Sequence, residues 1–349
     1  MTFHSIKSYK RPRAFLPLFS AIGSGILLMT LQTTPAKAST YYSCSAPSGC
    51  QLVGARLLTS NYTTTQHPVV LAHGLGGFNK LFGALDYFYG IPQTLMRGGT
   101  DVFATKTSAI NNSEVRGEQL LAQVKLISAI SGNPKVNLIG HSQGGIDVRY
   151  VAGVAPEYIA SATAVSSPEQ GSKTADAVLR QLSEGTITTE AALGLFKLIG
   201  IATDIGSGVS VTKLQEQDGW KSLVALSTDG AAEFNARFPA AMPTTYCGQP
   251  ADIEVNGIKY YSFSGVGQLT NLLDAGDPLL LSTSTTYRGE PNDGLVSTCS
   301  SRLGYVIRDN YRMNHLDSVN QVLGLVAFGS VNPTTVYRSQ VNRLKNANL

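Results

Sequence analysis

The sequence is poor in the residues that mark several common functional classes. Of its 349 residues only 14% are charged, and it holds five histidines, four cysteines and one tryptophan. The cysteines do not have the spacing of a zinc site, and we find no internal repeat or low-complexity tract. The 35 glycines lie among apolar runs, so they indicate tight turns rather than disorder. The length allows one large core or two ordinary ones.

Long apolar runs are also scarce, with one exception near the N-terminus. Four basic residues lie within 7–13, an apolar run follows at 14–31, and Ala-Lys-Ala stands at 36–38. This order is typical of a secretory signal peptide, so we expect cleavage after Ala38 and an exported protein. An uncleaved membrane anchor is the alternative, but Pro17, two glycines and two serines interrupt the run.

The apparent positive charge belongs to this first segment. The formal net charge is +4, and residues 1–38 hold five of the 27 basic residues and no acidic one. The remaining chain would therefore carry 22 basic and 23 acidic side chains. Nucleic-acid binding requires a basic face, so we expect no nucleic-acid partner.

Cysteines in an exported chain usually form disulfides, and four cysteines allow three pairings. Cys44 and Cys50 lie close together in a stretch with serine, glycine and proline. We therefore expect them to pair locally, which leaves Cys247 with Cys299. We interpret residues 39–66 as an N-terminal extension ahead of a catalytic domain at 67–349.

Short apolar runs alternate with helical patterns along that domain. Strands are predicted at 68–72, 101–105, 136–139, 160–166 and 258–264. Helices are predicted after Ser113, which could cap the first of them, and at 146–151. This alternation is typical of an α/β protein with a largely parallel sheet and helices on both faces.

Gly-His-Ser-Gln-Gly at 140–144 follows an apolar strand and opens a helix. A Gly-x-Ser-x-Gly sequence in this context is the nucleophile elbow of the α/β-hydrolase fold. Its sharp turn strains the backbone at the serine, and the glycines avoid steric clashes. We therefore predict that Ser142 is a catalytic nucleophile. The alternative is an ordinary serine in a glycine-rich turn.

A serine nucleophile needs a general base, and the candidates are His4, His67, His73, His141 and His315. The first leaves with the signal peptide, and His141 belongs to the elbow and points away from Ser142. His67 and His73 precede the serine, whereas the chain order in this fold is serine, acid, histidine. His315 remains as the predicted base.

The acid of the triad must lie between the serine and the histidine. Asp293 stands in an Asn-Asp-Gly turn, 22 residues before His315 and just ahead of an apolar pair. Such a turn is usually only a turn, so residue chemistry alone leaves Asp274, Asp277 and Asp309 as alternatives.

An oxyanion hole requires backbone N–H groups directed at the developing negative charge. Gln143, which follows the nucleophile, is predicted to supply one of them. The glycine-rich loop at 73–78 could supply the second from Leu75. A plain tight turn is the alternative for that loop.

Residues 175–210 break the alternation of strands and helices, and 188–205 is helical in composition but strongly apolar. This segment could be a core helix. It could equally be an apolar helical lid over the site, because it is inserted just after the predicted nucleophile.

Four motifs together resemble the foldase-dependent true lipases of bacterial family I. They are His-Gly-Leu-Gly-Gly-Phe at 73–78, Ser-Glu-Val-Arg-Gly-Glu-Gln-Leu-Leu at 113–121, Val-Asn-Leu-Ile-Gly-His-Ser-Gln-Gly-Gly at 136–145, and Asn-Tyr-Arg-Met-Asn-His-Leu-Asp at 310–317. The similarity runs from about Pro68 to Leu349. It implies triacylglycerol hydrolysis on an α/β-hydrolase core, with Asp293 as the triad acid. It also implies a Cys247–Cys299 disulfide, whereas Cys44 and Cys50 have no counterpart in the family.

The resemblance further implies one structural Ca²⁺ ion held by oxygen ligands, which suit this cation. The ligands would be the carboxylates of Asp274 and Asp317 and the backbone carbonyls of Gln321 and Leu325. Asp317 could instead cap a helix at 318–326, or do both. The family also implies a lipid substrate at an oil–water interface, a membrane-anchored foldase, and export from the periplasm as a folded protein. We expect a monomer.

These predictions combine into a secreted triacylglycerol lipase with a Ser-His-Asp triad and an acyl-enzyme intermediate. One alternative is a carboxylesterase that acts on soluble short-chain esters. Another is a non-catalytic binding protein on a hydrolase scaffold, which would require a broken triad.

Overall fold

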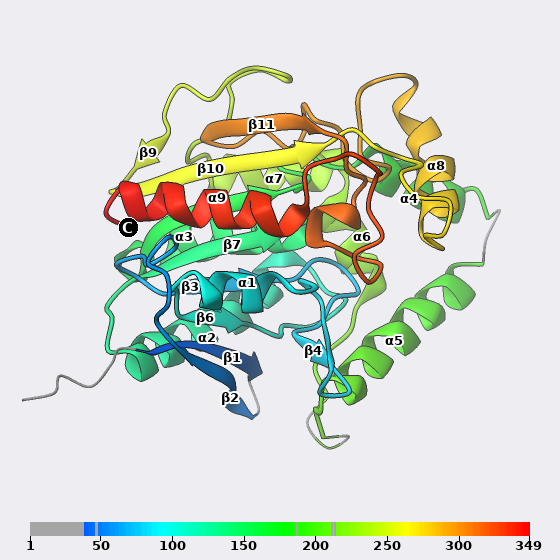
Figure 1. Ribbon diagram of the computed structural model, residues 1–349. Helices are drawn as coiled ribbons and strands as arrows, with labels where there is room; N and C mark the ends of the chain where they lie inside the picture. The colour runs from blue at the N-terminus through cyan, green and yellow to red at the C-terminus, as the bar shows by residue number, and fades with distance from the viewer. Residues whose placement is uncertain (1–37, 46–47, 186–187, 211, 213) are drawn as a thin grey trace, which may run out of the picture. The chain divides into compact units, whose positions relative to one another are not determined.

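A mostly parallel sheet forms the centre of the computed structural model (Figure 1). The structure describes residues 38–45, 48–185, 188–210, 212 and 214–349, so the expected signal peptide lies outside it except for Ala38. Among these residues the strand order is β11-β10-β8-β7-β3-β6-β1-β2, and β9 pairs with β10. Within this sheet only the β1–β2 and β9–β10 pairs are antiparallel. The predicted α/β architecture is confirmed.

The strands of this sheet are β1 (Ala38–Ser45), β2 (Gly49–Leu57), β3 (Val69–Ala72), β6 (Val102–Ala104), β7 (Val136–His141), β8 (Ile159–Val165), β9 (Glu254–Val255), β10 (Ile258–Gly265) and β11 (Tyr305–Tyr311). A separate two-stranded sheet contains β4 (Lys80–Leu81) and β5 (Leu85–Asp86). Every residue of β3, β7 and β8 is buried, as expected for parallel strands that are covered on both faces.

Helices cover both faces of the sheet. The described helices are α1 (Ile91–Arg97), α2 (Ser113–Ser131), α3 (Gln143–Val154), α4 (Lys173–Ser183), α5 (Thr189–Gly206), α6 (Gly219–Leu226), α7 (Thr228–Arg237), α8 (Asp277–Ser284) and α9 (Pro333–Asn346). Apolar residues of α2 and α3 share one buried cluster with Val70 and Leu138, whereas those of α1 and α9 share another with Val69 and Leu71. Alternate side chains of a strand thus point to opposite helical layers.

One helix prediction, the cap of α2, is wrong. The side chain of Asn112, not Ser113, caps α2, because Asn112 Oδ1 accepts the Val115 N–H at 3.2 Å. None of the described helices has the length and apolar character to cross a membrane.

The predicted N-terminal extension forms part of the sheet. Strand β1 pairs with β6 in parallel, and Tyr41 is buried in the core. The described residues belong to one compact unit, so the predicted boundary at residue 66 does not mark a structural division. Cys44 lies opposite Cys50 in the β1–β2 hairpin, and these two residues form a disulfide, as do Cys247 and Cys299. Both predicted pairings are confirmed.

The apolar segment after the elbow is only partly packed. In α4, Ala175 and Leu182 are buried, and Ala175 packs with α6 and α7. In contrast, Leu198 on α5 is 65% exposed, and Ile199 and Ile205 are also exposed. For these side chains the core-helix interpretation of 188–205 is wrong.

Candidate active site

Ser142 lies in a sharp turn between β7 and α3. Its backbone has φ 53° and ψ −129°, a positive-φ conformation that is strained for a residue with a side chain. A Cβ atom on Gly140 would overlap the Gly144 carbonyl, and one on Gly144 would overlap the Ala72 carbonyl. The turn therefore requires glycine at both flanking positions, and the predicted elbow has the expected local geometry.

His315 and Asp293 are buried and in direct contact. His315 Nδ1 lies 2.9 Å from Asp293 Oδ2, and the His315 N–H donates to the Asp293 carbonyl at 2.9 Å. The other carboxylate oxygen of Asp293 accepts the N–H groups of Leu295 and Val296 at 3.1 and 2.9 Å. This turn therefore fixes the carboxylate in the orientation that meets the imidazole.

The alternative acids have other partners. Asp309 pairs with Arg302 at 2.8 Å, and Asp277 accepts the N–H groups of Thr270 and Asn271. Asp274 accepts the Gly276 N–H at 2.7 Å. Of the four carboxylates that residue chemistry left open, the structure brings only Asp293 to His315.

His141 connects the elbow to the loop that carries His315. The rings of these two histidines have centroids 4.6 Å apart, and His141 Nε2 lies 3.0 Å from the His315 carbonyl oxygen. Because Ser142 follows His141 directly, these contacts hold the His315 loop beside the elbow.

The glycine-rich loop at 73–78 also lies against the elbow. A Cβ atom on Gly74 would stand only 2.7 Å from Ser142 Cβ, so the loop backbone touches the serine. The N–H of Leu75 donates no hydrogen bond to any residue that the structure describes. Gln143 begins α3, where an N–H has no intrahelical acceptor. Both N–H groups are therefore available to an oxyanion.

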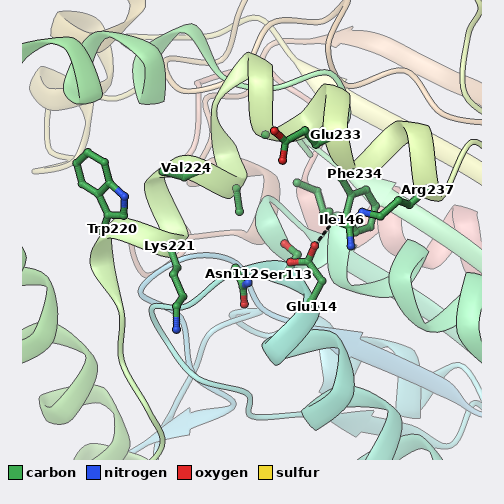
Figure 2. A pocket seen from close by; sticks show the side chains of 12 residues that line it. Asn112, Ser113, Glu114, Ile146, Trp220, Lys221, Val224, Glu233, Phe234 and Arg237 are labelled. Atoms are coloured by element: carbon green, nitrogen blue, oxygen red, sulfur yellow. Dashed lines mark hydrogen bonds and ion pairs between the residues drawn. The ribbon is translucent and has the colours of Figure 1, made fainter. Parts of the chain in front are cut away.

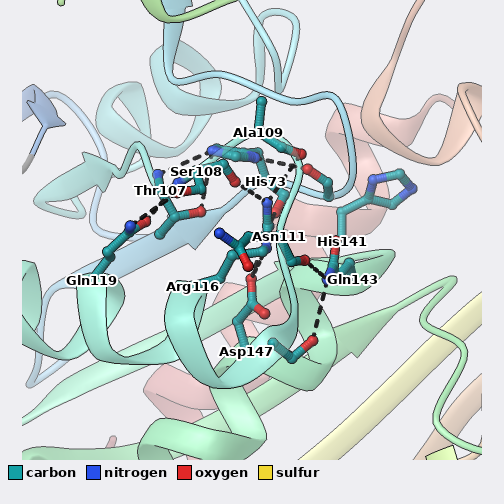
Figure 3. Close-up of polar contacts among 12 residues, drawn as sticks. His73, Thr107, Ser108, Ala109, Asn111, Arg116, Gln119, His141, Gln143 and Asp147 are labelled. Atoms are coloured by element: carbon teal, nitrogen blue, oxygen red, sulfur yellow. Dashed lines mark hydrogen bonds and ion pairs between the residues drawn. The ribbon is translucent and has the colours of Figure 1, made fainter. Parts of the chain in front are cut away.

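The side chain of Gln143 is committed elsewhere. It is fully buried, and its Nε2 donates to the Asn111 carbonyl at 2.7 Å (Figure 3). Any contribution of Gln143 to an oxyanion hole therefore comes from its backbone.

A buried ion pair that the sequence did not predict supports the loops around the site. Arg116 on α2 lies 2.8 Å from Asp147 on α3 and also donates to the carbonyls of His73 and Ser108 (Figure 3). Burial raises the pKa of Asp147 to about 6, although the guanidinium opposes this shift. Arg116 lies within the motif at 113–121, but nothing in that motif indicates that its side chain is buried against Asp147.

The predicted calcium ligands lie on neighbouring loops. Asp274 is buried, and its Oδ2 accepts the Val322 N–H at 3.3 Å. Asp317 is fully buried, and its Oδ1 has no hydrogen-bond partner among the described residues. The carbonyls of Gln321 and Leu325 likewise accept no hydrogen bond from the part of the chain that is described. Two buried carboxylates and two free carbonyls are a donor set that fits a calcium ion.

Electrostatics around Asp317 agree with such a fit. Burial raises its pKa to about 7, and the carboxylates of Asp277 and Asp274 add to the shift. A divalent cation would offset this repulsion. The alternative of a helix at 318–326 is wrong, because only a single 3-10 turn, η4 (Asp317–Val319), forms there, with Leu316 at its N-cap position.

A cavity of about 310 Å³ lies between the start of α2 and helices α6 and α7 (Figure 2). Its lining includes Ile146, Trp220 and Phe234, together with Glu114 and Arg237, which form an ion pair. None of the predicted site residues lines it, so we assign it no part in the site.

Comparison with known proteins identifies the family. Residues 67–238 match the family described as alpha/beta hydrolase fold. A triacylglycerol lipase of Vibrio cholerae serotype O1 is 47% identical over 84% of this chain and 92% of its own length. A triacylglycerol lipase of Pseudomonas fragi is 39% identical over 82% of this chain and 98% of its own length.

Among solved structures, the mature form of a Bacillus licheniformis lipase has a TM-score of 0.54 at 17% identity, over 83% of this chain and 96% of that one. This likeness supports the fold. The sequence identities, over nearly the full length of the relatives, show that the chain belongs to the triacylglycerol lipase family of the α/β-hydrolase fold, a family of carboxylic ester hydrolases.

Proposed function

We propose that this protein is a secreted lipase that hydrolyses long-chain acylglycerol esters through a triad of Ser142, His315 and Asp293. The observation that carries the proposal is the 2.9 Å contact between His315 Nδ1 and Asp293, on a loop that contacts His141 directly before the strained Ser142. An ionised carboxylate can only accept hydrogen bonds. The proton of the neutral imidazole therefore resides on Nδ1, which leaves Nε2 as the basic nitrogen.

The triad acts in two stages. His315 removes the proton of Ser142, whose Oγ attacks the ester carbonyl, while the N–H groups of Leu75 and Gln143 bind the oxyanion. His315 then protonates the leaving alcohol to give an acyl-enzyme. Water, activated by the same imidazole, releases the fatty acid by the reverse steps. Asp293 stabilises the imidazolium that forms in each stage.

The proposed calcium ion is structural. Asp274, Asp317 and the carbonyls of Gln321 and Leu325 would hold it, and its charge would neutralise two buried carboxylates. Asp317 is two residues from His315, so the ion would fix the loop that carries the base. We expect chelation of calcium to lower the thermal midpoint, and added Ca²⁺ to restore it. Chelation should change the thermal midpoint of an Asp274→Asn variant only a little. An equal fall of the midpoint in that variant would contradict the proposed calcium site.

An exposed apolar face favours a lipid substrate over a soluble ester. We call it the apolar face, and it consists of Leu272, Leu273, Leu279, Leu281, Leu323 and Phe328. Asn271 Nδ2 donates to the Val326 carbonyl, so the two segments that bear it lie side by side. The only charged residues within 269–281 and 318–332, Asp274 and Asp277, are buried. Such a surface costs free energy in water and gains it against acyl chains.

We propose that α5 is a lid that opens at the lipid surface. Its exposed Leu198, Ile199 and Ile205 support this role, because lipid contact costs them far less than water does. The resemblance of the four motifs supports two further proposals, a membrane-anchored foldase as a folding partner and export as a folded monomer. The two disulfides agree with an oxidising compartment.

The test compares emulsified long-chain triacylglycerol with a soluble short-chain ester, using the wild type and Ser142→Ala. The protein is supplied with a chaperone if it does not fold alone. High activity on the emulsion that the substitution abolishes would establish a lipase with Ser142 as nucleophile. Activity on the soluble ester alone would indicate a carboxylesterase. Full activity of Ser142→Ala would overturn the assignment, and no activity on either ester would favour a non-catalytic binding protein.

A further inference from the structure

Two buried histidines beside the site have no part in the reaction steps above. His73 and His141 are each 1% exposed. Burial lowers the pKa of both imidazoles well below 6.5, so both are neutral. A neutral histidine in a fixed position has one donor and one acceptor nitrogen, and the partners of each ring reveal which is which.

The ring of His73 forms hydrogen bonds that hold the loop next to Ser142. Its Nδ1 lies 2.8 Å from the Gly74 carbonyl oxygen, which can only accept. Its Nε2 lies 3.1 Å from the Thr107 nitrogen, which can only donate. His73 therefore carries its proton on Nδ1 and donates it to Gly74.

The other side of Gly74 is held through Tyr87. The Gly74 N–H donates to Tyr87 Oη at 3.2 Å, and Tyr87 Oη lies 2.7 Å from His141 Nδ1. His141 Nε2 faces the His315 carbonyl, which can only accept. His141 therefore carries its proton on Nε2, and its Nδ1 accepts the Tyr87 hydroxyl. This hydrogen-bonded chain runs from the glycine-rich loop to the residue proposed as the base.

The Tyr87 contact holds the peptide group before Gly74, and the His73 contact holds the one after it. The Gly74 carbonyl and the Leu75 N–H lie in the same peptide plane and point in opposite directions. A donor that holds the carbonyl therefore also sets the direction of the N–H. The Gly77 N–H, at 3.1 Å from the same carbonyl oxygen, adds a second donor.

We infer that His73 and Tyr87 are positioning residues that clamp Gly74 from both sides and thereby aim the Leu75 N–H at the oxyanion. The inference rests on the proposed function, since it assigns a support to the proposed oxyanion hole. Neither side chain exchanges a proton with the substrate. The clamp acts on the transition state, where the negative charge develops, and not on binding of the neutral ester.

Two replacements of His73 separate its two hydrogen bonds. In His73→Asn the amide nitrogen stands the same number of bonds from Cα as Nδ1, so it can still donate to Gly74. In His73→Gln the amide lies one carbon further out, near the position of Nε2, where it can accept from Thr107 but no longer reaches Gly74. Tyr87→Phe removes only the hydroxyl and tests the other side of the clamp.

The variants are compared on a soluble short-chain ester and by their affinity for a boronic acid that forms a tetrahedral adduct with the serine. We expect His73→Gln to lower kcat by roughly tenfold to a hundredfold, with KM within about twofold, because loss of an oxyanion donor costs up to about a thousandfold. Boronic acid affinity should fall in parallel. His73→Asn should keep most of the wild-type kcat and most of the boronic acid affinity. Tyr87→Phe should lose about threefold to tenfold in kcat.

A merely structural role for His73 would give another pattern. Equal losses in the Asn and Gln variants, or an effect confined to KM, would overturn the inference. If the His73 variants do not fold, Tyr87→Phe decides it, and wild-type kcat and boronic acid affinity in that variant would refute the clamp. Full activity of Ser142→Ala would instead refute the proposed function, so the two failures are distinguishable.

Discussion

The glycine-rich loop beside Ser142 and the apolar face differ in composition and burial. The loop at 73–77 is held by buried polar groups, and the supporting side chain of Arg116 is fully buried. The apolar face is exposed, with Leu272 at 88% and Phe328 at 98%. This difference suits the two regions to different proposed tasks. Reaction geometry needs rigid, directional bonds, whereas contact with lipid needs apolar area without direction.

Helix α5 carries both a buried ion pair and exposed apolar side chains. Near its C-terminal end Asp204 forms a fully buried ion pair with Lys106 at 2.7 Å. Burial lowers the pKa of that lysine to about 8, although Asp204 opposes the shift. In the middle of the helix Leu198 is exposed. The buried ion pair ties the helix to the body of the protein, and in the proposed lid the exposed side chains would meet a lipid surface.

Among the polar groups of the site, replacement of Asp293 by asparagine should cause the largest loss of kcat. Asparagine can donate to His315 Nδ1, which would place the imidazole proton on Nε2 and remove the base. A comparable change in a serine protease triad lowers kcat by about 10⁴-fold. We expect a loss of that order on a soluble ester. Asp309→Asn serves as the control, because Asp309 pairs with Arg302 away from His315. A residual kcat above a tenth of the wild type would contradict the assigned acid.

Asp147→Ala should cost the most folding stability. It leaves the Arg116 charge buried without its partner, and breaking a buried ion pair in this way typically costs about 3–5 kcal/mol. Urea unfolding would measure the loss. The matched control is Glu216→Ala in the exposed pair with Lys221, where we expect less than about 1 kcal/mol. Equal effects at the two sites would show that burial does not distinguish them.

Replacement of Leu272, Leu273 and Phe328 by serine should have the smallest effect on folding and a clear effect on lipid contact. Exposed substitutions usually change stability by less than about 0.5 kcal/mol each. Burial of such a side chain in an apolar phase gains about 1.5 kcal/mol or more, so partition onto a neutral lipid emulsion should fall roughly tenfold for each residue. The measurement uses Ser142→Ala as background, so that turnover does not change the emulsion.

The control for that experiment is the exposed apolar pair Leu52 and Leu57 on β2, at the far edge of the sheet. Serine at these two positions should leave partition unchanged. If the β2 control lost as much partition as the triple variant, lipid contact would depend on total apolar surface rather than on the apolar face.

The predictable and unpredictable parts of the fold differ in burial. Strands β3, β6, β7, β8 and β10 match the predicted runs, because central parallel strands are buried and largely apolar. Strands β1, β2 and β11 were not predicted. Strand β11 contains Arg308, Asp309 and Asn310 and lies at the sheet edge, where one row of backbone groups and many side chains remain in water. No periodic apolar pattern is needed there.

The sequence by itself determined the elbow around Ser142, the chain order of serine, acid and histidine, and the pairing of the four cysteines. These features depend on short motifs and on the small number of candidates, such as five histidines. Residue chemistry alone left four aspartates as possible partners of His315. The family resemblance implied Asp293, and the tertiary structure shows the contact itself. It also gave His73 and His141 their partners and paired Arg116 with Asp147. The reason is physical: a hydrogen bond depends on distances of a few tenths of an ångström between residues far apart in the chain, and no local pattern encodes those distances.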